Sequence, residues 1–294
     1  MIDRCYLEIT NICNLDCVFC PKNARKKQRM TMEQFDLLTD KLRGQIRFLY
    51  FHLMGEPMLH PLLSDFIAMA RDKGFIPVLT TNGTLLGRGL DVMPHKIQIS
   101  LHSQEGNEPR DGVGEADALA KAADREAAYI DEVMRFAQDA ASRGTIVVLR
   151  LWNQGGFDSR NDAIHQLIAR HIAQDGWTQR YDGWKLAEKI YLEYDQMFEW
   201  PDEAHSECGA DEVFCYALRN QIGVHVDGTV VPCCLDHDGS VKLGNLFEQS
   251  LSDILSSPRA TALYEGFSRH KASEEFCRKC DYAAVTKRFR KPSA

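Results

Sequence analysis

The sequence predicts an α/β fold built on a parallel sheet. Segments typical of strands and of helices alternate along the first two thirds of the chain, several helical segments carry boundary residues, and the composition changes after Pro201. Parallel strands are joined by crossover connections, usually helices, in right-handed βαβ units. We therefore expect a sheet that is either open or curled towards a barrel, followed by a smaller C-terminal region.

Six segments are expected to form the strands of this sheet. Residues 4–10 (RCYLEIT) alternate and are rich in β formers, and residues 46–54 (IRFLYFHLM) are apolar and aromatic enough for a buried strand. The remaining strands are expected at residues 75–81, 96–103, 145–152 and 189–200.

The helices between these strands are marked by apolar periodicity and by their end residues. Residues 31–42 begin with Thr31, a plausible N-cap, and are followed by Gly44. Residues 61–74 start with proline and end with glycine, and residues 124–144 have a long amphipathic pattern. One more helix is expected at 161–174, inside a polar stretch that otherwise breaks the pattern.

The last third of the chain has a different character. Residues 222–234 (IGVHVDGTVVPCC) predict a β-hairpin that turns at Asp227 and Gly228. Short helices are expected near residues 250–256 and 258–267, before the CRKC sequence. We place a domain boundary near Pro201, so that residues 1–200 form the α/β domain and residues 201–294 a small extension.

Composition and charge exclude some classes of protein. The formal net charge of −7 argues against a nucleic acid as the main partner, because phosphate neutralisation needs a basic surface. No apolar run approaches a membrane span, and the N-terminus has no signal-peptide pattern. We expect a cytoplasmic protein, in which disulfide bonds are rare, so the ten cysteines favour metal or cluster ligation.

Three of the cysteines lie on one short loop directly after the first expected strand. Cys13, Cys17 and Cys20 have the spacing C-x3-C-x2-C. Three thiolates can hold three irons of a [4Fe–4S] cube and leave the fourth iron open for another ligand. Zinc or inert core cysteines are the alternative, but structural zinc sites usually present four ligands.

This loop resembles the cysteine motif of the radical S-adenosylmethionine (SAM) superfamily, including the aromatic Phe19 before the third cysteine. The resemblance implies a partial (β/α)6 TIM-like barrel and a [4Fe–4S] cluster whose unique iron chelates SAM. One-electron reduction, with flavodoxin or ferredoxin as the donor, would then cleave SAM to a 5'-deoxyadenosyl radical. Phe19 would pack near the adenine.

Other motifs follow the later strands in the order that this family shows. MGEP (residues 54–57) is similar to the family's GGEP, with Met54 in place of the first glycine; the resemblance places Gly55 and Glu56 at the methionine end of SAM. Further implied contacts come from Asn82, Ser100, His102, Arg150 and Asn153. The alternatives are a solvated carboxylate for Glu56, turn capping or packing for Ser100 and His102, and a salt bridge for Arg150.

A second group of cysteines occupies the last third. Its pattern resembles the SPASM/Twitch extension of radical SAM enzymes, which implies one auxiliary [4Fe–4S] cluster held by Cys215, Cys233, Cys277 and Cys280. A structural zinc is the alternative, and Cys208 or Cys234 could replace one of the ligands. A non-ligand Cys234 could also donate a hydrogen atom to a substrate radical or merely pack, while Cys5 is expected to be buried.

The resulting hypothesis is an enzyme that abstracts a hydrogen atom from a peptide or a small molecule. Return of hydrogen from Cys234 would give epimerisation, loss of an electron to the auxiliary cluster would give dehydrogenation, and attack by a bound thiol or carbon would give a crosslink. The alternative is a two-cluster electron-transfer or redox-sensing protein without turnover. The basic run at residues 24–29 (ARKKQR) is either a solvated loop or a docking patch for the electron donor.

Overall fold

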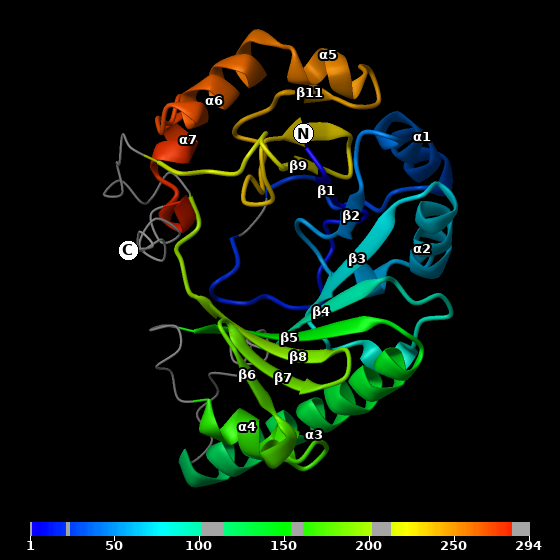
Figure 1. The fold of residues 1–294 in the computed structure, drawn as a ribbon, viewed down its shortest axis with the longest axis vertical. Coiled ribbons are helices and arrows are strands. Elements are labelled where there is room, and N and C mark those ends of the chain that lie inside the picture. The colour runs from blue at the N-terminus through cyan, green and yellow to red at the C-terminus, as the bar shows by residue number, and fades with distance from the viewer. Residues whose placement is uncertain (1, 22–23, 102–114, 154–160, 202–212, 284–294) are drawn as a thin grey trace. The chain divides into compact units, whose positions relative to one another are not determined.

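A computed structural model describes residues 2–21, 24–101, 115–153, 161–201 and 213–283 (Figure 1). Contacts divide the chain into two compact units. The first unit contains Met1–Cys13, Cys20–Pro77 and Phe198–Ala294, and the second contains Asn14–Phe19 and Val78–Met197. These units combine distant segments of the chain and do not test the expected domain boundary near Pro201, which stays a prediction.

The sheet of the first unit is centred on β1 (Arg4–Leu7). β1 pairs in parallel with β2 (Phe48–Phe51) on one side and with β9 (Gln221–Val224) on the other. β9 turns back into β10 (Thr229–Val231), which pairs antiparallel with the short β11 (Gly244–Asn245). The predicted hairpin is therefore present, with Gly228 at φ +81° in its turn. The hairpin extends the sheet of the first strand, which the sequence analysis did not anticipate.

Two of the predicted helices cover this sheet. In α1 (Met32–Leu42), Thr31 and Gln34 form a capping box, as the N-cap prediction requires. Together with α2 (Leu63–Asp72), α1 buries an aromatic core in which the rings of Phe35 and Phe66 stack at 4.3 Å. A short 3₁₀ turn lies between β2 and α2 (Pro57–Leu59), and the extension adds α5 (Leu251–Leu255), α6 (Pro258–Ser268) and α7 (Glu275–Arg278).

In the second unit, four strands run parallel. They are β3 (Ile76–Thr81, whose first two residues belong to the first unit), β4 (Lys96–Ser100), β5 (Ile146–Asn153) and β8 (Ile190–Gln196). Two antiparallel strands, β7 (Gly183–Ala187) and β6 (Thr178–Arg180), follow at the edge. The sequence analysis missed both, because their polar stretch shows no clear period. The helices are α3 (Glu115–Ser142) and α4 (Asp162–Ala169), with 3₁₀ turns at Leu86–Arg88 and Gln174–Gly176.

The two faces of the second unit's sheet differ in polarity. On one face, Ile99, Leu149 and Leu192 are fully buried on three neighbouring strands. On the other, Ser100 pairs with Arg150 and Arg150 pairs with Glu193, and all three are half-buried. Residues that pair across a sheet point to the same face. This face therefore presents a row of polar side chains, with Ser100 at the end of β4 and with Arg150 and Glu193 within β5 and β8.

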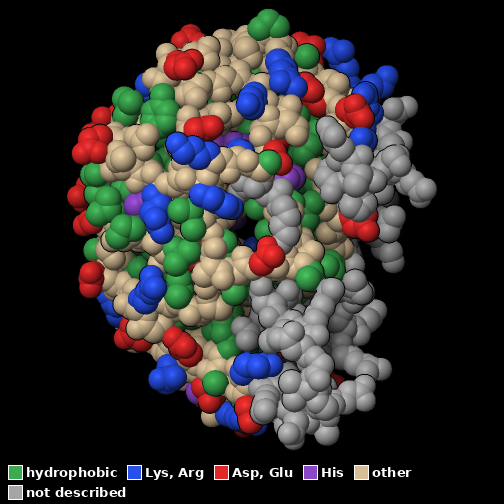
Figure 2. All heavy atoms as spheres, turned by 180° about the vertical axis from the view of Figure 1, so that it is seen from behind, with side chains coloured by type: hydrophobic (Ala, Val, Ile, Leu, Met, Phe, Trp, Pro, Cys, Tyr) green, Lys and Arg blue, Asp and Glu red, His purple; other side chains and the backbone are tan. Residues whose placement is uncertain are grey.

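Charge and hydropathy of the described residues agree with the composition. On the face that Figure 2 shows, lysine and arginine side chains are interspersed with aspartate and glutamate. None of the described helices is long and apolar enough to cross a membrane. Each described cysteine is a free thiol.

Candidate active site

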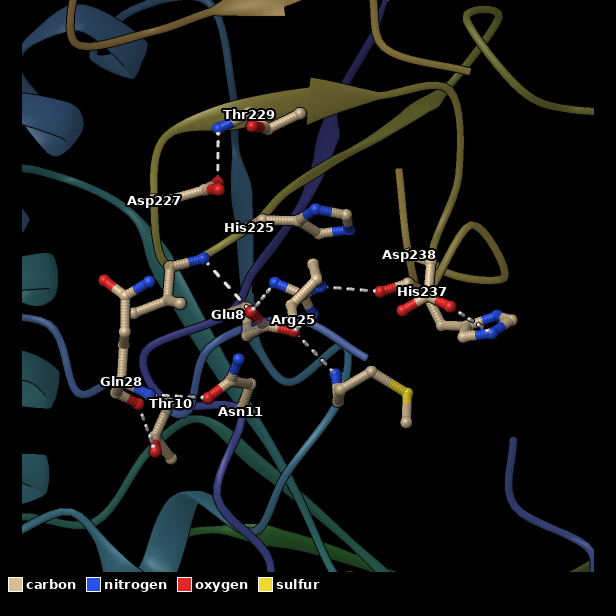
Figure 3. A network of polar contacts seen from close by, with 12 residues as sticks. Glu8, Thr10, Asn11, Arg25, Gln28, His225, Asp227, Thr229, His237 and Asp238 are labelled. Atoms are coloured by element: carbon tan, nitrogen blue, oxygen red, sulfur yellow. Dashed lines mark hydrogen bonds and ion pairs between the residues drawn. The ribbon is translucent and has the colours of Figure 1, made fainter. Parts of the chain in front are cut away.

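The cysteine loop begins after β1 and is closed at its base by hydrogen bonds. The Thr10 hydroxyl donates to the carbonyl of Gln28 at 3.0 Å, and the Asn11 carboxamide oxygen accepts from the Gln28 N–H at 2.7 Å. Asn11 also donates to the Lys26 carbonyl at 2.8 Å. Figure 3 shows the contacts of Thr10 and Asn11 with Gln28, between the two ends of the loop. The base of the loop is thus fixed by residues that precede and follow the cysteines.

The three cysteines differ in exposure. Cys13 is exposed, Cys17 is buried and Cys20 is half-buried. Their loop contains no regular helix or strand, and no disulfide removes any of these thiols. A free-thiol donor set on an irregular loop fits an iron–sulfur cluster, which takes thiolate ligands.

The MGEP loop lies against the start of the cysteine loop. Gly55 has φ +81°, and a Cβ there would lie 2.5 Å from the Thr10 carbonyl oxygen and 2.9 Å from the Ile12 nitrogen. The Glu56 N–H donates to the Ile12 carbonyl at 2.8 Å. Glycine is therefore needed for the approach of two backbone segments, a reason that differs from the ligand approach expected from the sequence.

Glu56 is not a solvated carboxylate. It is 1% exposed, and its Oε1 accepts from the Met58 N–H at 2.9 Å, which caps the 3₁₀ turn that follows. The alternative of an exposed loop side chain is therefore wrong. Contact with SAM stays a prediction.

The TTNG sequence at residues 80–83, which contains Asn82, is hydrogen-bonded to the cysteine loop within the second unit. The Asn82 carboxamide donates to Asn14 Oδ1 at 3.1 Å and accepts from the Thr84 N–H and hydroxyl at 3.0 and 2.7 Å. Its carbonyl accepts from the Tyr129 hydroxyl at 2.9 Å. Asn82 is thus a buried connector between β3 and the residue that follows Cys13.

The remaining SAM-contact candidates lie at the carboxyl ends of β4 and β5 or beside them. The Phe19 ring contacts the Trp152 ring edge-on at 5.4 Å. Arg150 forms an ion pair with Asp195 at 3.4 Å, so the salt-bridge alternative describes one of its contacts. Ser100 ends β4, whereas His102 lies outside the described residues, as does Cys208.

The structure gathers the four predicted auxiliary ligands in the first unit. Burial raises the pKa of Cys233 well above the ordinary thiol range, and the charges of Cys234, Cys215, Cys280 and Cys277 raise it further, that of the adjacent Cys234 most. Burial raises the pKa of Cys280 to about 12 and also raises the pKa of Cys215 and of Cys277. Buried thiols in such mutual proximity need a cationic group if they are to be thiolates.

Backbone amides also point at these sulfurs. The Ala217 N–H donates to Cys215 Sγ at 3.4 Å, and backbone N–H groups of Ala283 and Tyr282 lower the pKa of Cys280. Within the described residues, no His, Cys, Asp or Glu side chains are grouped so that they could hold a metal ion. A cubane separates its four thiolates by its own body, so its ligands lie farther apart than those of a single ion. The donor set fits a cluster.

Cys234 has different surroundings from Cys233. It packs against Leu53, Met54 and Val231, and Cys20 packs against the same three residues. The charge of Cys234 is also a cause, after burial, of the raised pKa of Tyr6. The two adjacent cysteines therefore differ in their surroundings. Cys233 is influenced by the other auxiliary thiols, and Cys234 packs on the apolar residues that Cys20 also contacts.

One charged pair near the cysteine loop was missed from the sequence. Glu8 is fully buried, and Arg25 binds it with both terminal nitrogens at 2.8 and 2.6 Å (Figure 3). Arg25 belongs to the basic run at residues 24–29, which is therefore not simply a solvated loop.

The sequence matches the family described as "Radical SAM superfamily" over residues 7–168 and "Iron-sulfur cluster-binding domain" (SPASM) over residues 215–281. The chain belongs to the radical SAM superfamily. Membership brings a [4Fe–4S] cluster and SAM, and the protein is an enzyme of this class with a C-terminal iron–sulfur domain.

Two relatives are similar in sequence to this radical SAM chain, one along nearly its whole length and one over a short segment. It is 25% identical over 293 residues to the S-adenosyl-L-methionine-dependent 2-deoxy-scyllo-inosamine dehydrogenase of Niallia circulans, covering 95% of this chain and 92% of the relative. It is 36% identical over 86 residues to the tungsten-containing aldehyde ferredoxin oxidoreductase cofactor-modifying protein of Pyrococcus furiosus, but this match covers 28% of this chain and only 24% of that protein.

Two solved structures confirm the predicted fold class, a partial radical SAM barrel with an antiparallel C-terminal extension. BtrN in complex with AdoMet and 2-DOIA aligns with a TM-score of 0.55 at 17% identity, covering 96% of this chain and 93% of that one. Streptococcus suis SuiB bound to its precursor peptide SuiA aligns with a TM-score of 0.52 at 13% identity, covering 98% of this chain and 73% of that one. The family thus includes proteins solved with a small molecule and with a peptide.

Proposed function

We propose that this radical SAM enzyme dehydrogenates an alcohol of a small, polar substrate. A cluster held by Cys13, Cys17 and Cys20 would supply the electron for cleavage of SAM, and the resulting radical would remove a hydrogen atom from a substrate carbon. An alcohol becomes a carbonyl when its carbon radical also loses a proton and one electron, and a cluster held by the second group of cysteines would be the acceptor of that electron. The protein's own residues bind and orient the reactants and exclude other hydrogen donors.

The first group of ligands in this proposal is Cys13, Cys17 and Cys20. The proposal gives Gly55 and Glu56 to the methionine end of SAM, and it gives Phe19, Asn82, Ser100, His102 and Arg150 to the remainder of the cosubstrate or to the substrate. The fixed base of the cysteine loop and its contact with MGEP support this assignment, because both keep the motifs in register.

The second group of ligands is Cys215, Cys233, Cys277 and Cys280, which would hold one auxiliary [4Fe–4S] cluster. Their common burial and mutual electrostatic influence support this set. The packing of Cys234 on the same apolar cluster as Cys20 favours Cys233 over Cys234 as the ligand.

The row of polar side chains across β4, β5 and β8 carries the choice of substrate class. Ser100, Arg150 and Glu193 stand side by side on one sheet face, and among the described residues the Glu193 carboxylate makes no ion pair. A face of this kind suits a hydroxyl-bearing or amine-bearing small molecule better than an apolar one. The end-to-end likeness to 2-deoxy-scyllo-inosamine dehydrogenase supports the same class and the same reaction.

Iron content and SAM cleavage test the ligand sets. Reconstituted wild-type protein is expected to hold about eight irons per chain, whereas the triple variant C13A/C17A/C20A and the double variant C215A/C277A should each hold about four. Cys5→Ala is the matched control, because Cys5 is a fully buried thiol on β1 that belongs to neither set. Anaerobic incubation with SAM and dithionite should give 5'-deoxyadenosine only when the first set is intact. No 5'-deoxyadenosine from the wild-type protein would instead favour the electron-transfer alternative.

The reaction itself is tested with a panel of aminocyclitols and amino sugars under the same conditions. Dehydrogenation predicts a product two mass units lighter than the substrate, in equal amount to 5'-deoxyadenosine. A product of unchanged mass would exclude it.

Epimerisation by hydrogen return from Cys234 is the second candidate, because this thiol packs against the same residues as Cys20. It predicts a product of unchanged mass that gains one deuterium in D₂O, and loss of that product in Cys234→Ala. Cys5→Ala again serves as the control. The electron donor, flavodoxin or ferredoxin, stays a prediction, as does a cytoplasmic location.

A further inference from the structure

Glu8 follows β1 and is the most confined charged side chain around the cysteine loop. Its relative exposure is 0%, and burying a carboxylate is costly unless it is paired and hydrogen-bonded. Arg25 Nη1 donates to Oε1 at 2.8 Å, and Nη2 donates to Oε2 at 2.6 Å. This bidentate geometry is the strongest form of an arginine–carboxylate contact.

Two backbone amides complete the shell of Glu8. The Met54 N–H donates to Oε2 at 3.1 Å, and the Val226 N–H donates to Oε1 at 3.1 Å. Each oxygen therefore accepts two hydrogen bonds, which fills the acceptor sites of an ionised carboxylate. The site is specific for a carboxylate, because all four surrounding groups are hydrogen-bond donors. A side chain that carries a donor of its own, such as a carboxamide, would place that donor against another one.

The four donors come from three segments that the sequence analysis assigned to separate tasks. Arg25 lies five residues after Cys20, Met54 is the first residue of MGEP, and Val226 lies in the hairpin of the extension. Arg25 Nε also donates to the carbonyl of His237, three residues after Cys234, at 2.9 Å. Figure 3 shows Glu8 and Arg25 with Asn11 and Gln28 on one side and the hairpin residue His225 on the other, and these residues all belong to the first unit.

We propose that Glu8 and Arg25 are positioning residues that use the auxiliary-cluster hairpin to hold the cysteine loop and MGEP in the register that SAM requires. Neither touches a reactant. The Glu8 carboxylate binds both the Met54 N–H of MGEP and Arg25 at the end of the cysteine loop. The hairpin holds this pair in place, because Val226 binds Glu8 and the carbonyl of His237 binds Arg25. This proposal rests on the assignment of the cysteine loop and MGEP to the SAM site.

The decisive variant is Glu8→Gln, which keeps the shape of the side chain and loses the second acceptor. In one orientation its NH₂ group faces Arg25 Nη2 and the Met54 N–H, and in the other it faces Arg25 Nη1 and the Val226 N–H. Arg25→Lys is a milder second variant, which keeps the charge and loses the fork.

Lys73→Gln is the matched control. The Lys73 side chain is 13% exposed, against 14% for Arg25, and it also makes two short carboxylate contacts, to Asp36 at 2.6 Å and Asp40 at 2.7 Å. These partners lie on α1, away from the cysteine loop in the sequence. A general loss of an ion pair should therefore affect Lys73→Gln as well.

The experiment measures SAM binding by the reconstituted, reduced proteins, from the change that SAM causes in the electron paramagnetic resonance signal of the first cluster. Glu8→Gln and Arg25→Lys are expected to hold the wild-type amount of iron and to bind SAM at least tenfold more weakly, whereas Lys73→Gln binds it normally. Wild-type SAM affinity in both test variants, with lowered thermal stability alone, would overturn the proposal. If wild-type protein itself showed no response to SAM, the proposed function would fail instead.

Hydrogen exchange gives a readout that needs no cluster turnover. The Met54 and Val226 amides are expected to exchange faster in Glu8→Gln than in wild-type protein, and to be unchanged in Lys73→Gln. Unchanged protection of both amides in Glu8→Gln would contradict the hydrogen-bond assignment on which the proposal depends.

Discussion

Gly55→Ala gives a quantitative test of the contact between MGEP and the cysteine loop. Gly55 has φ +81°, a conformation that costs a residue with a Cβ about 1 kcal/mol. The added Cβ would also lie 2.5 Å from the Thr10 carbonyl oxygen and 2.9 Å from both the Asn11 carbon and the Ile12 nitrogen. All three are backbone atoms, which cannot rotate away.

The size of the steric effect follows from overpacking measured in other cores, about 1–3 kcal/mol. The Glu56–Ile12 and Asn11–Gln28 hydrogen bonds resist the shift that would relieve the contact. Gly55→Ala should therefore lower the stability by about 3 kcal/mol in total, or roughly 6–10 °C in Tm for a chain of this size.

Gly44→Ala is the control for the backbone term alone. Gly44 has φ +75° after α1, and a Cβ there would meet nothing within 4 Å. It should lower the stability by about 1 kcal/mol, or roughly 2–4 °C. Thermal unfolding of the reduced proteins under anaerobic conditions measures both. Equal values of Tm for the two variants would refute the steric argument. Normal SAM binding by Gly55→Ala would show that the contact of Gly55 with residues 10–12 does not position MGEP for SAM.

Two further predictions concern hydrogen bonds around the site. Burial lowers the pKa of His60, whose Nδ1 accepts from the Leu62 N–H while Nε2 donates to the Met30 carbonyl. The unfolded chain therefore binds more protons than the folded one below about pH 6.5, so the free energy of unfolding should fall as the pH drops. This fall should be smaller in His60→Gln. If urea titrations from pH 7 to 5 gave the same dependence of that free energy on pH for both proteins, the prediction would be contradicted. Asn82→Ala loses three side-chain hydrogen bonds, or about 2–3 kcal/mol, whereas Asn82→Asp loses the one to Asn14, or about 1 kcal/mol. Identical Tm values for the two variants would rule out this assignment.

Local patterns gave reliable predictions where the physical cause was itself local. The capping box of Thr31 and the turn at Gly228 depend on residues a few positions apart, and both are present. The family assignment likewise rested on Cys13, Cys17 and Cys20, whose spacing lies within one short loop.

Pairings between distant segments could not be derived in this way. β9 joins β1 from more than two hundred residues away, and the β6–β7 hairpin pairs a short, exposed polar strand with a five-residue strand that has little apolar alternation. Such strands are defined by the partner that completes their hydrogen bonds, which a local pattern does not contain. The same holds for Gly55, which the resemblance placed at the methionine end of SAM and whose contact with residues 10–12 was not expected.

Glu8 shows that a signal for tertiary pairing was nevertheless present in the sequence. In the alternation of the first strand, Cys5, Leu7 and Ile9 fall on one face, which leaves Tyr6, Glu8 and Thr10 on the other. The structure buries Glu8 fully, so that its carboxylate requires a cation, and Arg25 in the basic run after the cysteines supplies it. The buried carboxylate of Glu8 before the three cysteines and the guanidinium of Arg25 after them therefore form one bidentate pair, which closes the cysteine loop from both ends.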